Sequence, residues 1–274
     1  MSDTFDPFVA DWVSFASDQR YNLVEKCLKL AQMLEYPNLN IDNQIEKVSE
    51  IAKSLKTTLS DVKNPTYLIS MLNEHLFTHL GFVGDTEDYY DPKNNFLNEV
   101  LDKKSGIPIT LSIIYVEVAR QIGLDLKICG FPSHVVVKYN EEMVLDPFGG
   151  GRLLSVEDLE EILYRNFGEE VEFLPEFLDE LPEDKVLIRI IRNLKNSYAQ
   201  SYAYEKALRC TNMILQVEPD SPEEIRDKGI ILERLLNYKD ALEHLNKYLE
   251  IAPEAPDADF VLELIRNTRE KINR

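Results

Sequence analysis

The chain has 274 residues, of which 44% are hydrophobic, and its formal net charge is −19. This length and composition suit one large globular domain or two smaller ones. The excess of acidic residues argues against a nucleic-acid binder, which needs a basic face, and against docking on anionic lipid. The three cysteines are far apart and odd in number. They give no disulfide framework or zinc spacing and are typical of reduced thiols.

The first residues, MSDTFDPFVADW, are acidic and lack the basic region and apolar run of a signal peptide. No window approaches 18 uninterrupted apolar residues, so we expect no membrane span. Together with the cysteine usage, these features predict a cytoplasmic protein.

Helical spacing of apolar residues predicts that the N-terminal part is helical, over residues 7–15, 22–34, 39–55 and 65–80. On the last of these helices His75 and His79 stand four apart on one face, where they could share a metal ion. Leu76 occupies the position at which a His-Glu-x-x-His motif has glutamate, and no third ligand is evident. We therefore predict no metal site, and no motif indicates a cofactor.

The central stretch combines a dense apolar helix with short strands. Pro108 suits the first turn of a helix whose apolar residues, between Ile109 and Ile122, cover most of its circumference, which indicates a buried helix. Strands are predicted over 126–130, 133–139 and 143–146. His134 then starts one strand and Asp146 ends the next. In an antiparallel pair the two side chains would lie close together.

Four motifs follow one another in this stretch: Asn94-Asn95-Phe96-Leu97, Lys104-Ser105-Gly106-Ile107-Pro108-Ile109, Gly130-Phe131-Pro132-Ser133-His134 and Asp146-Pro147-Phe148-Gly149-Gly150. They resemble the SirB-type branch of the transglutaminase-like superfamily, with departures at Asn95, Lys104 and Ser133. The resemblance covers most of the chain after residue 70. It implies a papain-like core in which a helix is followed by a strand with His and a strand with Asp.

In active members of that superfamily a cysteine at the start of the helix attacks, a histidine is its base and an aspartate orients the imidazole. Counting back from Ala119-Arg120, which closes the helix, the cysteine position falls on Pro108. Proline has no nucleophilic group. The resemblance therefore implies a pseudoenzyme that keeps His134 and Asp146 but has lost the attacking residue.

An enzyme remains the alternative: an amide hydrolase or acyl transferase of the cysteine-peptidase or transglutaminase type, with an unusual nucleophile. The candidates near the motifs are Thr110, Ser112 and Cys129. A side chain of this kind within hydrogen-bond reach of the His134 ring would favour the enzyme.

After a helix over 155–165, residues 168–184 carry eight acids and two prolines, which indicates a linker that docks by a few apolar side chains. Beyond it the chain repeats. Tyr204-Glu205-Lys206-Ala207-Leu208 recurs as Tyr238-Lys239-Asp240-Ala241-Leu242, and Pro219 recurs as Pro253. The 34-residue period is that of the tetratricopeptide repeat. Two motifs are fewer than such repeats need alone, so flanking helices over 186–203 and 258–272 should complete the module.

These patterns predict an α+β, mostly helical fold in three parts. Residues 1–168 form N-terminal helices and a transglutaminase-like core with a small antiparallel sheet, 169–184 an acidic linker, and 185–274 the repeat module. The function we expect is protein interaction or regulation. A protein or peptide partner would bind in the repeat groove, and the sequence does not determine the oligomeric state. The candidate groove residues are Asn193, Asn196, Arg226, Lys228 and Arg234.

Overall fold

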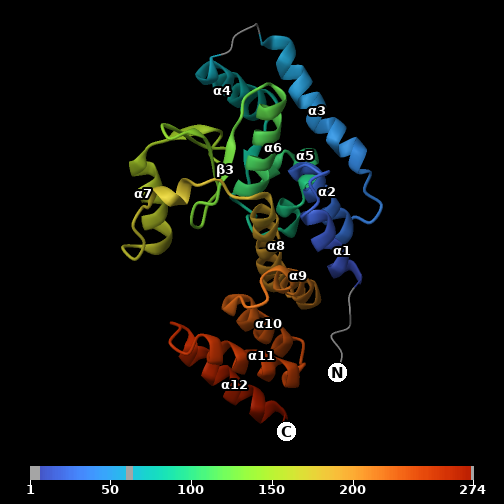
Figure 1. Ribbon diagram of the computed structural model, residues 1–274, viewed down its shortest axis with the longest axis vertical. Helices are drawn as coiled ribbons and strands as arrows, with labels where there is room; N and C mark the ends of the chain where they lie inside the picture. Colours follow the sequence, from blue (N-terminus) through green and yellow to red (C-terminus); the bar gives the residue numbers. More distant parts are fainter. Residues whose placement is uncertain (1–6, 60–63, 273–274) are drawn as a thin grey trace. The chain divides into compact units, whose positions relative to one another are not determined.

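A computed structural model describes residues 7–59 and 64–272 (Figure 1). The chain divides into two compact units. The core unit is Asp18–Leu187, and the repeat unit combines Met1–Ser17 with Ile188–Arg274. Helix α1 (Pro7–Ala16) thus lies in the repeat unit, whereas the sequence-based division grouped it with residues 1–168. The indole Nε1 of Trp12 donates to the carbonyl oxygen of Met213 at 3.1 Å.

Several helices of the core unit begin where the sequence supplies a capping side chain. The side chains of Asn22, Asn40, Asn64 and Ser155 each accept a backbone N–H from three residues further on, which satisfies a donor that the first helical turn leaves unpaired. The helices are α2 (Leu23–Leu34), α3 (Ile41–Thr58), α4 (Pro65–Asn73), α5 (Leu97–Lys103), α6 (Pro108–Gln121) and α7 (Val156–Phe167).

Helix α6 is the centre of the core unit (Figure 1). It packs against α2, α3, α4 and α5 and against strands β3 and β4. Every residue from Pro108 to Tyr115 is buried. Burying each large aliphatic side chain contributes roughly 1.5–3 kcal/mol. Gly123, just beyond the helix, has φ +88°, as expected of a glycine that stops a helix.

A four-stranded antiparallel sheet carries the histidine and aspartate motifs. Its strands are β3 (Lys127–Cys129), β4 (Val136–Asn140), β5 (Met143–Asp146) and β6 (Arg152–Leu154), in the order β3-β4-β5-β6. One sequence-based expectation is corrected: His134 does not start a strand but lies two residues before β4. The glycine turn after Asp146 leads into β6, which pairs with β5 and was not predicted. The three-residue β6 is too short to show alternation in sequence.

Short elements frame the sheet and α6. Strands β1 (Val83–Gly84) and β2 (Ser105–Gly106) form a parallel pair. The predicted helix over 65–80 changes at Glu74 into a π-helical turn, η1 (Glu74–His79). Two 3₁₀ turns are η2 (Pro92–Asn95) and η3 (Pro175–Leu178).

The acidic residues 169–184 pack in the core unit. The Leu181 N–H donates to the Ile128 carbonyl at 2.8 Å, and Glu180 bridges to Cys129 in β3. Leu178 is buried, with Phe173 and Phe177 packed against the same cluster.

The repeat unit has the predicted 34-residue period. Helices α9 (Tyr204–Val217) and α11 (Tyr238–Ile251) have equal lengths and begin 34 residues apart. Ala207 and Ala241 are fully buried where neighbouring helices cross. Helix α8 (Glu183–Gln200), which begins in the core unit, precedes α9, and α10 (Pro222–Arg234) and α12 (Ala258–Ile272) complete the unit. Among the described residues no helix is long and apolar enough to cross a membrane.

Candidate functional site

His134 stands on a strained turn before β4. Its N–H donates to the Phe131 carbonyl at 3.1 Å, and Ser133 has φ +57°. A left-handed conformation costs a residue with a Cβ about 1–2 kcal/mol. Glycine would adopt this conformation without that cost, so Ser133 adds a local conformational strain to the turn.

The His134 ring is joined to Asp146, the last residue of β5. The distance from Nε2 to Asp146 Oδ1 is 3.0 Å, and the side chains are 14% and 7% exposed. The other carboxylate oxygen, Oδ2, faces Arg152 Nε at 3.9 Å. A carboxylate bonded to one ring nitrogen fixes the orientation of an imidazole, which is the role of the aspartate in a Ser-His-Asp triad, although that aspartate contacts Nδ1 and Asp146 contacts Nε2.

Phe148 lies between His134 and Tyr89. Its ring is 6.0 Å from the His134 ring and 6.1 Å from that of Tyr89, both edge to face. A Cβ on Gly84 would lie 2.7 Å from the Phe148 ring. Glycine in β1 is therefore what allows this aromatic side chain to approach. The loop over 81–92 and the Asp-Pro-Phe turn together enclose one side of the histidine.

Asn73 braces the glycine turn that follows Phe148. Its Nδ2 donates to the Gly151 carbonyl at 2.8 Å, and its Oδ1 accepts from the Tyr115 hydroxyl at 2.7 Å. Gly151 has φ +76°, and a Cβ there would lie 2.1 Å from Asn73 Oδ1. The brace joins α4, α6 and the turn that carries Asp146. Sequence reasoning missed Asn73 and Tyr89 because no motif marks them. The run Gly149-Gly150-Gly151 indicated only that the chain turns tightly there.

Pro108, which stands at the nucleophile position predicted from the sequence, is the buried first residue of α6. Each nearby hydroxyl or thiol is engaged elsewhere or unpaired. Thr110 Oγ1 donates to the Asn94 carbonyl at 2.9 Å. Ser112 Oγ is buried and has no hydrogen-bond partner among the described residues. None of the three sequence candidates is hydrogen-bonded to His134.

Cys129 is fully buried in β3, and its Sγ donates to the Leu178 carbonyl at 3.1 Å. Burial raises the pKa of its thiol to about 11. A thiol that stays protonated at neutral pH is a poor nucleophile. Cys27 and Cys210 are also buried and form no disulfide.

His75 and His79 do not form part of a metal centre in the described residues, where no group of three metal-binding side chains occurs. His75 Nε2 is 2.9 Å from Ser54 Oγ, and His79 Nε2 is 3.6 Å from Glu74. Burial lowers the pKa of His75. His75 therefore joins η1 to α3, whereas His79 faces Glu74 within η1.

The residues predicted to line a groove lie on α8 and α10 of the repeat unit. Asn193, Arg226 and Lys228 are half-buried, and Asn196 and Arg234 are exposed. Arg226 donates to Asp257 and to Asp227, each at 2.7 Å. Burial opposes its charge, but the two carboxylates raise the pKa of Arg226 on balance. An acidic ligand at Arg226 would therefore compete with two carboxylates of the chain itself.

Glu224 of α10 is only 1% exposed and joins α10 to α8. Its Oε2 accepts from Lys195 Nζ at 2.8 Å, and its Oε1 accepts from Arg192 Nε at 3.0 Å. Lys195 Nζ also donates to Asp227 at 2.5 Å. Sequence reasoning did not find this network, since nothing in the spacing of α8 and α10 distinguishes a buried charge from a solvated one.

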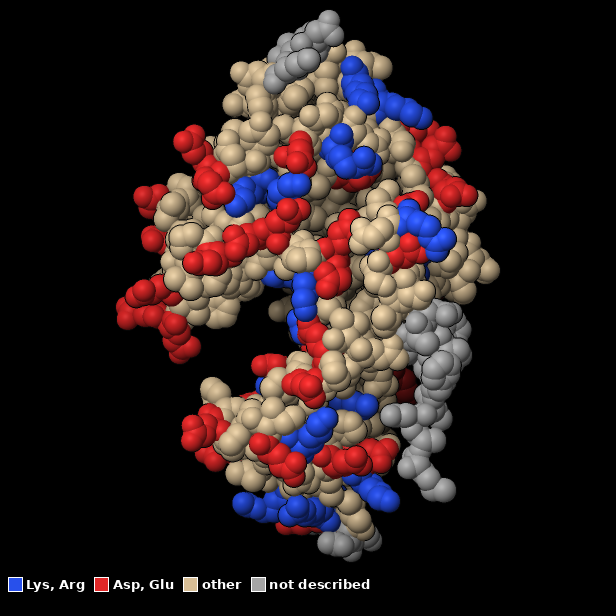
Figure 2. All heavy atoms as spheres, in the orientation of Figure 1, with Lys and Arg blue, Asp and Glu red and all other residues tan. Residues whose placement is uncertain are grey.

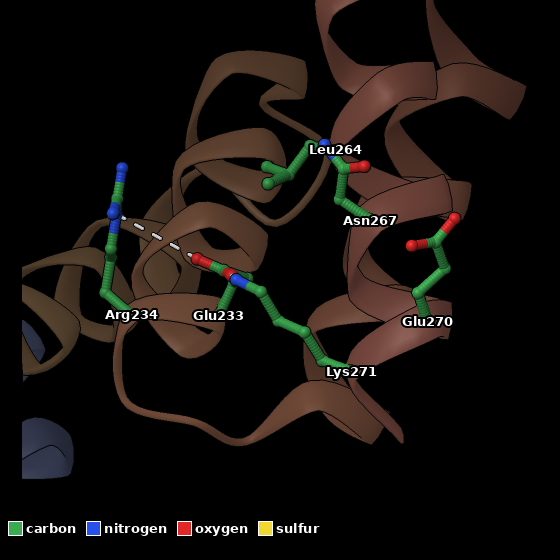
Figure 3. A pocket seen from close by; sticks show the side chains of 6 residues that line it. All are labelled: Glu233, Arg234, Leu264, Asn267, Glu270 and Lys271. Atoms are coloured by element: carbon green, nitrogen blue, oxygen red, sulfur yellow. Dashed lines mark hydrogen bonds and ion pairs between the residues drawn. The ribbon is translucent and has the colours of Figure 1, made fainter. Parts of the chain in front are cut away.

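A separate pocket of about 320 Å³ lies between α10 and α12 (Figure 3). Glu233, buried at its centre, pairs with Lys271 and, at 3.9 Å, with Arg234. Asn267 and Glu270 of α12 point into the same space (Figure 3). Of the candidate groove residues, only Arg234 lines this pocket. The Glu233 carboxylate at the centre of the pocket is already paired with Lys271 and Arg234.

Comparison with known proteins agrees with this architecture. A family model of the transglutaminase-like superfamily matches residues 42–192, and a model of the tetratricopeptide repeat matches residues 194–266. The predicted fold class, a mostly helical chain with a transglutaminase-like core followed by helical repeats, is confirmed.

Similar proteins match nearly the whole chain. The UPF0162 protein of Xylella fastidiosa (strain 9a5c) is 33% identical over 258 residues, which cover 91% of this chain and 92% of that protein. The UPF0162 protein of Vibrio cholerae is 26% identical over 243 residues, or 87% and 89% of the two chains. Protein SirB1 of Salmonella typhimurium is 26% identical over 232 residues, or 83% and 85%.

Proposed function

The chain belongs to the family of the SirB1 and UPF0162 proteins within the transglutaminase-like superfamily, and we propose that it acts as a non-catalytic protein-interaction or regulatory protein. The observation that carries this proposal is Pro108, which occupies the start of α6 where an active relative would have its thiol. Without that thiol the attack on an acyl carbon has no electron pair to begin it.

Two further observations support the proposal. Thr110, Ser112 and Cys129 make no hydrogen bond to His134, so the ring has no activated partner among them. The tetratricopeptide repeats support a role in protein interaction, because modules of this kind generally bind proteins or peptides. On this proposal a protein partner binds the repeat unit at α8 and α10, near Asn193, Asn196, Arg226 and Lys228.

The compartment that we propose is the cytoplasm. The three cysteines are buried and form no disulfide bond, as expected of thiols in a reducing environment.

A second candidate function is supported by the His134–Asp146 pair, which keeps the 3.0 Å contact of a catalytic dyad. In that case the chain is an amide hydrolase or acyl transferase with an unusual nucleophile. Ser112 is the residue to consider, because its buried hydroxyl lacks a partner.

The catalytic part of the proposal is tested by comparing the wild type with His134→Ala. Peptide hydrolysis and incorporation of a labelled amine into casein are measured for both proteins. We expect equal background rates. A wild-type rate that falls when His134 is replaced contradicts the proposal and supports the second candidate.

Restoring the missing thiol tests the assignment of Pro108. Because position 108 is buried, the readout is the ultraviolet absorbance of a thiolate. Pro108→Cys should add this absorbance to that of the wild type at neutral pH, because an imidazole beside a thiol at a helix N-terminus lowers the pKa of the thiol. The double variant Pro108→Cys with His134→Ala should lose the added absorbance, because the imidazole no longer stabilises the thiolate. Equal absorbance in the two variants would show that position 108 is not paired with His134.

The interaction part is tested with matched charge variants of the repeat unit. Lys228→Glu with Asn196→Glu changes α8 and α10, and Lys247→Glu with Gln216→Glu makes the same changes on α9 and α11. Arg226 is left in place because its carboxylate partners make it structural. Crosslinking in cell extract should lose the same partners only in the first variant. Retention of all partners in both variants contradicts a binding groove on α8 and α10.

A further inference from the structure

A second surface, in the core unit, has the form of a binding cleft. It lies where α7 ends and the chain turns back at Gly168, and its volume is about 640 Å³. Its walls come from α7 and from the segment that follows it. The lining residues are Glu160, Leu163, Tyr164, Gly168, Glu169, Val171, Glu172 and Phe173. The volume is within the range of cavities that hold small ligands or single side chains of a partner.

The floor of this cleft is apolar and is fixed from below. Leu163 is buried in the cluster beneath the sheet, and Val171 and Phe173 pack against that cluster. The Phe173 ring is 6.5 Å from the ring of Phe131. Tyr164, in contrast, is 64% exposed. A large aromatic side chain in this position offers contact area to a partner at a low entropic cost.

The rim of the cleft is acidic. Glu160, Glu169 and Glu172 are exposed and make no ion pair with any described residue. The surrounding sequence, residues 155–184, has twelve acids and a single basic residue, Arg165, which pairs with Glu161 at 2.6 Å. In Figure 2 acidic side chains gather along the left edge of the core unit, where Figure 1 draws α7. The C-terminal end of α7 adds the negative end of a helix dipole.

These charges do not indicate a metal site, since the described residues contain no group of three metal-binding side chains. They also contribute little to folding. Unpaired glutamates on a surface repel one another, and no cation in the described part of the chain pairs with these three. An apolar floor with a negatively charged rim instead complements a segment that is both apolar and basic.

We propose that this cleft, hereafter the α7 cleft, binds a basic amphipathic peptide segment of a protein partner. An aliphatic or aromatic side chain of the segment rests on Leu163, Tyr164 and Phe173. Flanking lysines or arginines meet Glu160, Glu169 and Glu172. The α7 cleft is distinct from the repeat unit, so this inference goes beyond the function proposed above and does not depend on the repeat groove.

The test uses the full chain and three fluorescein-labelled peptides of equal length. One alternates lysine with leucine, one alternates lysine with serine, and one alternates glutamate with leucine. Binding is followed by fluorescence anisotropy. We expect saturable binding of the lysine–leucine peptide, weakened by salt, and at least about fivefold weaker binding of the other two.

Variants then locate the site. Glu160→Gln with Glu169→Gln and Glu172→Gln should weaken binding of the lysine–leucine peptide about tenfold. Tyr164→Ser should weaken it at least about fivefold. The matched control, Glu243→Gln with Glu250→Gln and Glu263→Gln, removes the same charge from exposed positions of the repeat unit and should change binding less than twofold. All these side chains are exposed, so the variants should fold.

The outcomes separate the alternatives. Equal loss in both triple variants overturns the proposal, because binding then follows net charge alone. Binding of the lysine–serine peptide as tight as that of the lysine–leucine peptide, with competition by spermine, assigns the surface to polycations instead. The groove variant Lys228→Glu with Asn196→Glu should bind the peptide normally. A loss there, with the α7 cleft variants unaffected, would place the peptide on the repeat unit and leave the proposed function standing.

Discussion

Asp146 in the core unit and Glu224 in the repeat unit are both buried carboxylates, but their partners differ. Glu224 has a permanent cation on each oxygen, Lys195 and Arg192, and these contacts hold two helices together. Asp146 has a histidine at 3.0 Å and only a distant arginine, at 3.9 Å. A fully paired carboxylate holds helices in place, whereas a carboxylate paired with a titratable ring orients that ring.

The two units can be followed separately in experiments. The single tryptophan of the chain, Trp12, lies in the repeat unit, where it is buried against α9. Its fluorescence therefore reports unfolding of the repeat unit. The circular dichroism of the whole chain reports both units, so the difference between the two signals isolates the core unit.

The largest effect is expected from Glu224→Ala. This change removes the buried carboxylate that Lys195 and Arg192 share and leaves Lys195 with Asp227 alone; breaking a buried ion pair typically costs about 3–5 kcal/mol. Urea unfolding followed by Trp12 fluorescence should shift to a lower midpoint. Glu223→Ala, at the exposed neighbouring position, is the control and should stay within about 0.5 kcal/mol of the wild type. An equally small effect of Glu224→Ala would mean that the network is not structural.

Gly151→Ala should come second, and it should act on the core unit alone. The new Cβ would meet Asn73 Oδ1 at 2.1 Å and break the brace beside Asp146. We expect a loss of about 2 kcal/mol beyond that of Gly150→Ala. Gly150, the control position, has nearly the same φ, +75°, but a Cβ added there would meet no atom within 4 Å. Unfolding is measured by circular dichroism, and a shifted Trp12 transition would contradict the assignment.

Asp146→Asn should have a smaller effect. The amide keeps the shape of the side chain but loses a charge-assisted hydrogen bond to His134, worth roughly 1.5 kcal/mol. Asp125→Asn, at an exposed aspartate paired with Lys127, is the control and should cost less than about 0.5 kcal/mol. If Asp146→Asn were as costly as Glu224→Ala, the contrast between the two carboxylates would fail.

The smallest effect is a pH dependence in the core unit. Burial holds the pKa of His75 below its ordinary value of 6.5, so the unfolded chain binds a proton more readily than the folded one. Above pH 6.5 His75 is neutral in both states and does not lower the free energy of unfolding. That free energy falls as the pH drops from 6.5 toward the folded pKa of His75. His75→Gln should flatten the curve for the core unit between pH 7 and pH 5. The Trp12 transition should respond equally in both proteins.

Much of the fold follows from local patterns. Capping residues such as Asn22 and Ser155 mark helix starts because they satisfy backbone donors within three residues. The dense apolar run after Pro108 predicted a buried helix, and the 34-residue spacing of Ala207 and Ala241 predicted the repeats. The hairpin between β4 and β5 brings His134 and Asp146 together because it is short.

Other features depend on contacts between distant segments. Phe148 encloses His134 only because Gly84, far away in sequence, leaves space for it. Strand β6 forms because β5 is there to pair with it, and Trp12 packs beside Met213 across two hundred residues.

The sequence by itself determined the order of the helices, the repeat period and the proline that begins α6, since each is a property of neighbouring residues or of their spacing. Only the tertiary structure decided that Arg226 is bound by the chain's own carboxylates, that Glu224 is buried, and that the acids after α7 surround an apolar floor. Burial and charge pairing depend on which surfaces meet, and the sequence pattern of a single helix does not contain that information.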